Sequence, residues 1–355
     1  MVKIGSSSLT ENGIISRRKI GRIVDDVAGL RRRGYQVTIV TSGAIATGAG
    51  TLGKSIAKST MPEKQAFAAV GQTVLMNEYR HRFNAHGLHV GQILLTNDDV
   101  KNRVRFLNAR HTFEELLRMG IVPIVNENDT VAIREIRFGD NDMLSAHVSC
   151  MINADLLVIL SDVDGFYMDL HDPEPVEEIR AITDTIIERA GGTGSAVGTG
   201  GMISKIRAAQ IIMHFGEKMI IASANIPRVL NRIMDGEKIG TIFIGRERPL
   251  GGRKRWLALR RSSGTLTLDS GAVLALRVGK KSLLATGITE LKGKFMMGDI
   301  VELADPNGMI IGKGIVNYES DDLHRIIGKK SSEIKKILGE KMFDEVINRD
   351  DMIIY

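Results

Sequence analysis

Short runs of β-branched and apolar residues alternate with longer segments of helical period from residue 1 to about residue 245. Buried strands that alternate with helices form parallel sheets covered on both faces, so this pattern predicts an α/β fold with a mostly parallel sheet. Ligands of such sheets bind beyond the carboxyl ends of the strands. The strands are expected at 37–43, 89–96, 121–127, 156–162 and 218–223.

Three helices are expected between these strands. Apolar side chains recur at helical spacing over residues 20–30, and Ser16 is a suitable N-cap for that helix. A second apolar face covers residues 106–117. Pro62 can open a third, long helix because proline is tolerated in a first turn.

The chain changes character after residue 245. Segment 246–261 holds seven Lys or Arg residues against one Glu, which is typical of a solvated linker or of a segment that binds an anionic partner. Over residues 262–345, short apolar runs separated by Gly, Asp and Asn turns predict a small β-barrel domain. The expected order is therefore a first domain at 1–245, a basic linker and a second domain. Strands of the second domain are expected at 263–272, 282–288 and within 298–318.

The composition argues against several classes of protein. Cys150 is the only cysteine among 355 residues, so the chain can build neither a disulfide framework nor a thiolate metal site. No apolar run reaches the roughly 18 residues of a membrane span, and the opening MVKIGSSSL lacks the features of a secretory signal. We therefore expect a cytoplasmic protein without a membrane anchor.

Familiar catalytic motifs are also missing from the sequence. It contains no GxxxxGK[ST] loop and no strand-linked GxGxxG, which disfavours a P-loop or a dinucleotide site. It contains no HExxH pair and no GxSxG turn, which disfavours a zinc hydrolase and a serine hydrolase.

Two glycine-rich turns are candidates for binding phosphate. Lys3 stands in the first strand and is followed by Gly5-Ser6-Ser7, whose backbone N–H groups suit phosphate oxygens. Segment 198–205 leads into a helix, and a helix N-terminus beside Lys205 suits a polyphosphate. A flexible loop with a surface lysine is the simpler interpretation of each turn alone. The buried face of that helix is expected to contain Met202, Ile206, Ala209 and Met213, with Lys205 on another face.

Acidic and amide side chains gather in two further segments, 125–132 and 137–146. They follow an apolar strand together with Gly and are suited to binding an ammonium group or Mg²⁺, whereas turn formation is the alternative. Ser42 follows another strand in a small-residue turn that suits a carboxylate, and Ser161 and Asp162 end a third strand. The acidic and amide candidates are Asn126, Asp129, Asp140, Asn141 and Asp142.

Together these segments resemble the amino-acid kinase family, whose members form a three-layer α/β sandwich. The segments VKIGSS, TSGAI, KQAFAAVGQ, NENDTVA, FGDNDMLSA, SDVDGFY and GTGGMISK occur in the family's order, and the segment after residue 262 resembles a PUA domain. The resemblance implies ATP-dependent phosphorylation of the γ-carboxylate of L-glutamate with Mg²⁺, as the first step of proline biosynthesis. It also implies feedback inhibition by proline and a homo-oligomer, either a dimer or a tetramer.

The resemblance further implies a role for each candidate residue. Lys3 and Lys205 would contact the transferring phosphoryl group, and Asp142 would hold both lysines in place. Ser42, Asp129 and Asn141 would bind glutamate, with Asp140 and Asn126 in the same loops. The ATP site would comprise Lys3, Ser161, Asp162, Thr199, Gly200, Gly201, Met202, Ile203, Ser204 and Lys205. No protein ligand of the magnesium ion is implied.

Two alternatives remain open at this point. One is another carboxylate or phosphate kinase of the same fold, acting on acetylglutamate, aspartate or a nucleotide. The other is an RNA-binding protein whose kinase domain has lost its activity, with RNA held by basic side chains of the PUA segment. Because Lys3 stands almost at the start of the sequence, fraying of the first strand is also expected to loosen it.

Overall fold

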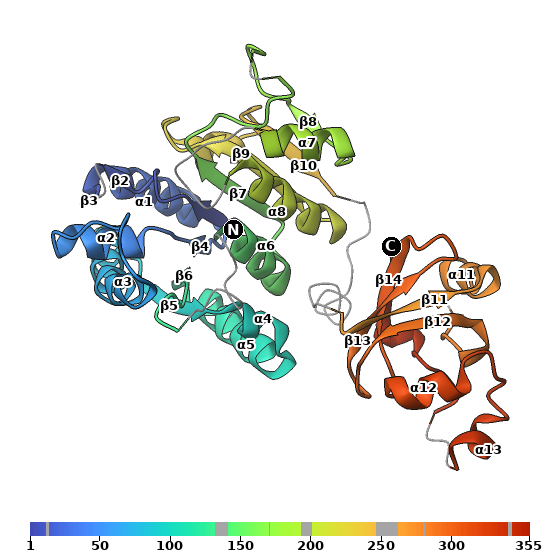
Figure 1. Ribbon diagram of the computed structural model, residues 1–355. Coiled ribbons are helices and arrows are strands. Elements are labelled where there is room, and N and C mark those ends of the chain that lie inside the picture. The colour runs from blue at the N-terminus through green and yellow to red at the C-terminus, as the bar shows by residue number, and fades with distance from the viewer. Residues whose placement is uncertain are drawn as a thin grey trace. The chain divides into compact units, whose positions relative to one another are not determined.

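The computed structural model describes residues 1–11, 14–131, 141–169, 171–192, 201–245, 262–279, 281–339 and 343–355. The chain divides into two compact units, Met1–Pro249 and Leu250–Tyr355 (Figure 1). The expected basic linker at 246–261 lies outside the described residues.

The first unit is built on an eight-stranded sheet. Every neighbouring pair is parallel except β9 and β10, which run antiparallel. This confirms the mostly parallel sheet that the alternating pattern predicts, and all five expected strands are present. In spatial order the strands are β5 (Val90–Leu95), β6 (Val122–Glu127), β4 (Ile39–Val40), β1 (Val2–Ile4), β7 (Leu156–Ser161), β9 (Lys218–Ser223), β10 (Thr241–Ile244) and β8 (Glu178–Ile179).

Strand β1 lies in the middle of this sheet. Lys3 is in register with Val40 of β4 on one side and with Ile159 of β7 on the other. A strand that is paired along both edges does not fray like a free terminus, because its backbone hydrogen bonds are made on both sides. The structure therefore holds Lys3 firmly, contrary to the expected loosening.

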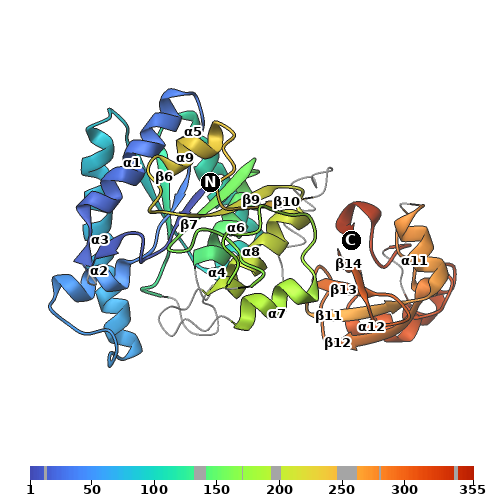
Figure 2. The same cartoon turned by 90° about the horizontal axis from the view of Figure 1, so that it is seen from above.

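Helices cover both faces of the sheet (Figure 2). Helices α1 (Arg17–Arg32), α3 (Met61–Asn84) and α9 (Val229–Met234) bury apolar side chains in one core with Val2 and Ile4 of β1. Lys3 points to the opposite face because side chains alternate along a strand. That face is covered by α6 (Asn141–Ile152) and α8 (Met202–His214), with α5 (Arg103–Arg118) beside α6.

The helix signals in the sequence are confirmed where they can be checked. Ser16 is the N-cap of α1, and its side chain accepts a hydrogen bond of 3.3 Å from the Lys19 N–H. Pro62 lies in the first turn of α3, which Thr60 and Glu63 cap reciprocally. The remaining elements of the unit are β2 (Thr10–Glu11), β3 (Ile14–Ile15), α2 (Ala44–Thr51), α4 (Asn97–Lys101) and α7 (Asp184–Gly192).

Helices α2 and α3 cross at two glycines. A Cβ added to Gly48 would lie 1.8 Å from the Phe67 carbonyl oxygen, and one added to Gly71 would lie 1.8 Å from the Ala44 carbonyl oxygen. No side chain fits such a gap, so the two backbones touch directly. This contact fixes the start of α2, which follows the end of β4, against the middle of α3.

The second unit contains one mixed five-stranded sheet over its own apolar core. Its strands are, in spatial order, β12 (Ile288–Gly293), β11 (Gly264–Leu268), β13 (Ile300–Ala304), β14 (Ile310–Ile315) and β15 (Met352–Ile354). Its helices are α11 (Ser270–Arg277), η2 (Ala285–Gly287), α12 (Ser320–Ile326), α13 (Ile334–Leu338) and η3 (Arg349–Asp351). Strand β15 lies beyond residue 345, where the sequence pattern placed the end of the domain.

The strand expected at 282–288 is wrong. Leu283 forms an isolated bridge, residues 285–287 form a 3₁₀ turn closed by the Gly287 N–H and the Leu284 carbonyl, and strand β12 begins only at Ile288. Leu283 and Ala285 are buried while Leu284 is exposed, which imitates the alternation of a strand.

None of the helices in the described part of the chain has the length and apolarity of a membrane span.

Candidate active site

Two lysines from distant parts of the chain meet one buried aspartate. Lys3 Nζ of β1 lies 2.5 Å from Asp142 Oδ1, and Lys205 Nζ of α8 lies 3.2 Å from Asp142 Oδ2. Asp142 is fully buried and both lysine side chains are less than a tenth exposed. The three residues that the resemblance assigns to catalysis are therefore in direct contact, while their catalytic role stays a prediction.

The electrostatics of Asp142 reflect this arrangement. Burial alone would raise the pKa of its carboxyl, but the charges and hydrogen bonds of Lys3 and Lys205 outweigh burial and hold the pKa below its usual value. The Ser204 hydroxyl also donates to Asp142 Oδ2 at 3.1 Å. Asp142 is therefore an ionised acid that fixes two ammonium groups at one point of the site.

Helix α8 begins beside this cluster. Gly201 is its N-cap, and a Cβ there would meet no atom of the described residues within 4 Å. Ile206 and Ala209 are buried as expected, but Met202 and Met213 are only partly buried and Lys205 is buried. The expectation that Lys205 lies away from the buried face was wrong because Lys205 has a buried acid, Asp142, as its partner. The predicted ATP-site residues Met202 and Ile203 lie in the first turn, whereas Thr199 and Gly200 lie outside the described residues.

The ends of β7 and β9 provide a second polar group. Ser161 is buried in register with Ser223, and the Ser161 hydroxyl donates to Asp162 Oδ1 at 3.1 Å. Asp162 is exposed. These residues lie where the α/β fold binds ligands, at the carboxyl ends of the strands, and their contact with ATP stays a prediction.

A cluster of amide side chains lies on the other side of Asp142. Asn141 Nδ2 lies 2.6 Å from the Thr41 carbonyl oxygen, 2.9 Å from Ser42 Oγ and 2.9 Å from Asn126 Oδ1. Asn126 Nδ2 in turn donates to Gln72 Oε1 of α3 at 2.9 Å. We call Gln72, Asn126, Asn141 and Ser42 the amide cluster. Since Asn141 and Asp142 are consecutive, the first turn of α6 joins the amide cluster to the two lysines.

Of the two acidic residues expected to bind glutamate, the structure describes one. Asp129 is half-buried just after β6, and its N–H donates to the Glu127 carbonyl at 2.9 Å. Asp140 lies outside the described residues. The structure thus brings Ser42, Asn126 and Asn141 together and places Asp129 on the strand end that carries Asn126.

The backbone around Ser42 is fixed from two directions. Gly43 has a φ of 92°, a left-handed conformation that glycine adopts without strain, and this lets α2 begin directly after Ser42. Tyr79 of α3 is fully buried, and its hydroxyl lies 3.0 Å from Thr41 Oγ1. The Gly43 turn sets where the Thr41 carbonyl and the Ser42 hydroxyl meet Asn141, whereas Tyr79 contacts the Thr41 side chain.

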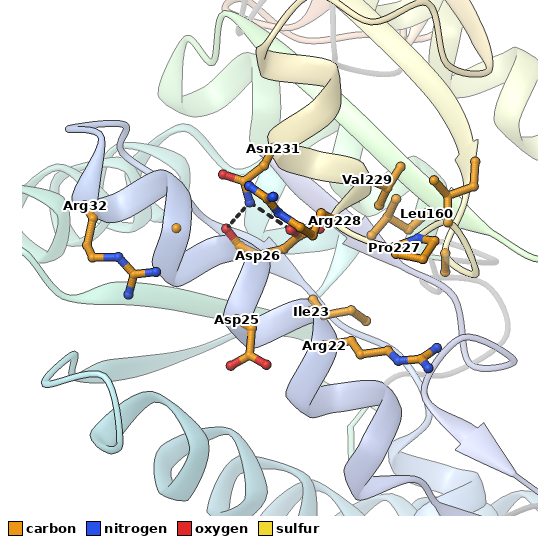
Figure 3. A pocket seen from close by; sticks show the side chains of 13 residues that line it. Arg22, Ile23, Asp25, Asp26, Arg32, Leu160, Pro227, Arg228, Val229 and Asn231 are labelled. Carbon is orange, nitrogen blue, oxygen red and sulfur yellow. Dashed lines mark hydrogen bonds between the residues drawn. The ribbon is translucent and has the colours of Figure 1, made fainter.

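A cavity of about 330 Å³ lies on the opposite face of the sheet, between α1 and the segment before α9 (Figure 3). Its floor includes Leu160 and Val229, and Asp26 is held there by Asn231 Nδ2 at 2.8 Å. Arg32 and Arg22 lie on opposite sides of Asp25 and Asp26 in this view. Since its charged groups do not converge and it contains none of the predicted site residues, we do not place substrate in this cavity.

Sequence analysis missed Gln72. It is only 8% exposed and ends the segment KQAFAAVGQ, which supports the family resemblance but was given no role for any of its residues. A polar side chain within the buried stripe of a helix is the signal that would have identified it, because buried polar groups need hydrogen-bond partners.

Comparison with known proteins agrees with this geometry. The amino acid kinase family matches residues 1–223, and the PUA domain matches residues 264–338. Proteins named glutamate 5-kinase are similar over the whole chain. Those of Caldanaerobacter subterraneus and Carboxydothermus hydrogenoformans are 43% and 46% identical, covering 100% of this chain and 97% and 96% of their own length. That of Dictyoglomus thermophilum is 45% identical and is covered over 96% of its length. The chain therefore belongs to the amino acid kinase family, within its glutamate 5-kinase branch, and carries a PUA domain after its kinase unit.

Proposed function

We propose that this chain transfers the γ-phosphoryl group of ATP to the γ-carboxylate of L-glutamate, giving ADP and γ-glutamyl phosphate as the first step of proline biosynthesis. The single observation that carries the proposal is the start of α6. There Asn141 belongs to the amide cluster and Asp142 holds the two lysines, so an amino-acid site and a phosphate site adjoin. The relatives named glutamate 5-kinase support this choice of substrate.

The proposed mechanism depends on alignment and on neutralising charge. A γ-carboxylate oxygen attacks the γ-phosphorus while the bond from that phosphorus to the β-phosphate oxygen breaks, and ADP leaves with that electron pair. Lys3 and Lys205 offset the negative charge of the two reactants and of the oxygens between them. A carboxylate is already ionised at neutral pH, so the chain needs no general base.

Magnesium fits this site as a partner of the nucleotide. Within the described residues no group of three His, Cys, Asp or Glu side chains is placed to hold a metal ion, and Asp142 is engaged by two lysines. Mg²⁺ commonly keeps phosphate and water oxygens and takes only one or two carboxylates from the protein. The exposed Asp162 at the end of β7 would supply such a carboxylate. When bound, the ion would neutralise phosphate charge.

The choice of substrate is tested by ADP release. The full chain is incubated with ATP, Mg²⁺ and, separately, L-glutamate, L-aspartate, N-acetyl-L-glutamate and UMP. We expect kcat/KM for glutamate to exceed that for each alternative by at least about a hundredfold, since a buried polar site rejects ligands that leave its groups unpaired. Preference for another substrate would assign the chain to a different kinase of this fold, and no turnover of any would favour a kinase domain that has lost its activity.

We propose that proline inhibits the enzyme at a site that overlaps the glutamate site. Proline has the α-carboxylate and a charged amine but no γ-carboxylate, so it can use the groups around Asp129 and Asp140 without being phosphorylated. Proline is then expected to compete with glutamate and not with ATP. Initial rates over a grid of both ligands test this, and inhibition that saturating glutamate does not relieve would place proline elsewhere.

The proposal extends to the rest of the chain. We propose that the kinase domain ends near residue 245, that 246–261 is a linker, and that the PUA domain begins at 262 and extends past the expected end at 345 through β15. A homo-oligomer in the cytoplasm, where ATP is available, completes the proposal. A chain ending at Gly245 contains every residue of the proposed site and is expected to phosphorylate glutamate, whereas an inactive but folded truncation would give the second unit a part in catalysis.

A further inference from the structure

Three amide side chains form a hydrogen-bonded series that ends at Asn141. Gln72 Oε1 accepts from Asn126 Nδ2, and Asn126 Oδ1 accepts from Asn141 Nδ2, both at 2.9 Å. The series begins on α3, passes through β6 and ends at the first residue of α6. Each amide therefore determines which end of its neighbour can face it.

Two backbone groups fix the direction of this series. The Glu127 N–H is a donor and lies 2.9 Å from the oxygen of Asn126, so that end of Asn126 has to be Oδ1. The Thr41 carbonyl is an acceptor and lies 2.6 Å from the nitrogen of Asn141, so that end has to be Nδ2. Reversing either amide would place two donors or two acceptors against each other.

The direction decides what Asn141 offers to a ligand. Its Nδ2 has two hydrogens, and three protein acceptors already surround it. Within the described residues, these contacts leave Asn141 Oδ1 as the polar atom available to a ligand, and an amide oxygen only accepts hydrogen bonds. A substrate that meets Oδ1 has to bring a donor, and an ammonium group is the strongest donor that an amino acid has.

We propose that Gln72 is a positioning residue that selects for the α-ammonium group of the substrate by holding Asn126, and through it Asn141, in this orientation. The inference rests on the proposed function and deepens it. Without the Gln72 oxygen, Asn126 Nδ2 would be a buried donor with no acceptor, and such a donor turns away or opens the site to water. Asn141 would then lose one of the acceptors that fix its amide.

The surroundings of Gln72 favour this role over one in stability. Gln72 is 8% exposed, and its own Nε2 is buried with no hydrogen-bond partner among the described residues. A buried donor without a partner costs stability, so a residue chosen for the fold alone would not carry it. The oxygen of the same amide has a partner, and that partner leads to the site.

Two substitutions at position 72 test the proposal. Gln72→Met keeps the volume and removes the oxygen, and we expect KM for glutamate to rise about tenfold, as for the loss of one buried hydrogen bond, with KM for ATP within twofold of wild type. Gln72→Glu keeps an oxygen that accepts from Asn126, and KM for glutamate should stay within about threefold of wild type. The preference in kcat/KM for glutamate over glutarate, which lacks the amine, should fall about tenfold in Gln72→Met only.

The remaining arms separate positioning from folding. Thr73→Val removes a hydroxyl from the neighbouring, exposed position of the same helix and should leave both KM values and the glutarate preference unchanged. Asn141→Ala combined with Gln72→Met should be no worse for glutamate than Asn141→Ala alone, because residues that act through one another are not additive. If Gln72→Met does not fold, Gln72→Asn shortens the amide by one methylene and serves in its place.

The outcomes distinguish this inference from the proposed function. If the wild-type chain does not phosphorylate glutamate, the proposed function fails before any variant is compared. If the wild type is active and Gln72→Met melts much lower with an unchanged KM for glutamate, Gln72 is structural and the inference is overturned. Equal increases in KM from the Met and Glu substitutions would overturn it as well.

Discussion

The two halves of the proposed site, a phosphate half and an amino-acid half, are built from different chemistry. The phosphate half consists of charged groups, two ammonium ions around a carboxylate, and all three are almost fully buried. The amino-acid half, as far as the structure describes it, is fixed by neutral amides and a hydroxyl. The two halves meet between consecutive residues, Asn141 and Asp142.

This difference agrees with what each half would have to do under the proposed function. Charge moves between oxygens while a phosphoryl group is transferred, so fixed cations stabilise the transition state more than the ground state. The head of the amino acid keeps its charges throughout, so the site needs only to orient it, and amides do this because each presents one donor end and one acceptor end. Five predictions test whether the halves are as separate as this comparison implies.

The largest effect is expected from Asp142→Asn. The substitution leaves two buried ammonium groups without their countercharge, and breaking a buried ion pair from one side costs about 3–5 kcal/mol in the free energy of unfolding. Denaturant unfolding at pH 7 measures this loss. A decrease of less than about 1 kcal/mol in the free energy of unfolding would mean that the lysines rotate to solvent and that the phosphate half is not preorganised.

The same pair of proteins gives a pH test. The pKa of Asp142 is lower in the folded chain than its ordinary value of 3.8. Its ionisation therefore stabilises the fold fully above that ordinary value, and the contribution is lost as the pH falls through the depressed folded value. The difference in unfolding free energy between wild type and Asp142→Asn should be constant at neutral pH and should shrink once the pH falls below about 3.8.

Next in size are the two lysines. Lys3→Ala and Lys205→Ala should each lower kcat by about a hundredfold or more, because each cation acts on charge that develops during transfer. Arg207→Ala is a matched control, since Arg207 is an exposed cation on the same helix as Lys205, and it should leave kcat unchanged. Steady-state rates within threefold of wild type for both lysine variants would remove them from the mechanism.

A smaller effect is expected in the amino-acid half. Asn141→Ala should raise KM for glutamate about tenfold to thirtyfold through the loss of one or two hydrogen bonds, with KM for ATP nearly unchanged. Asn141→Asp sharpens the comparison because it places a carboxylate against the Thr41 carbonyl and Asn126 Oδ1, and it should be at least as harmful. A fall in ATP affinity instead would mean that the two halves have been exchanged.

The smallest effect is expected outside both halves. Tyr79→Phe removes only the hydroxyl contact with Thr41, which should cost about 1 kcal/mol of stability and lower Tm by about 2–4 °C. Both KM values and kcat should stay within twofold of wild type. A tenfold change in KM for glutamate would show that the Thr41 side chain, and not only its carbonyl, belongs to the amino-acid half.

The sequence predicted more of the phosphate half than of the amino-acid half. Lys3, Asp142 and Lys205 lie in glycine-rich or acidic motifs, so a family resemblance could bring them together although they are far apart in the chain. The burial of Lys205 was not foreseen, because helical spacing shows a face and not its partner. Gln72 was missed because it lies among apolar residues of α3. Its contact with Asn126 depends on where the backbones of α2 and α3 cross.

That crossing could not be derived from composition or spacing. Gly48 and Gly71 look like ordinary helix glycines in the sequence, and only the packing shows that a methyl group on either would collide with a carbonyl. The same limit applies to residues 282–288, where burial alternates but the backbone turns. Local patterns thus predicted most elements of the sheet, while contacts between distant elements required the structure.

The central place of β1 has a consequence for how the protein is made. A ribosome delivers β1 and β4 early, but β7, the other neighbour of β1, emerges only after β6 and α6, and Lys205 follows later still. Until then β1 is an edge strand of an unfinished sheet, and an open edge is a template for pairing with another chain. Any nascent fragment that stalls before β7 is therefore exposed to aggregation at the same strand that carries Lys3.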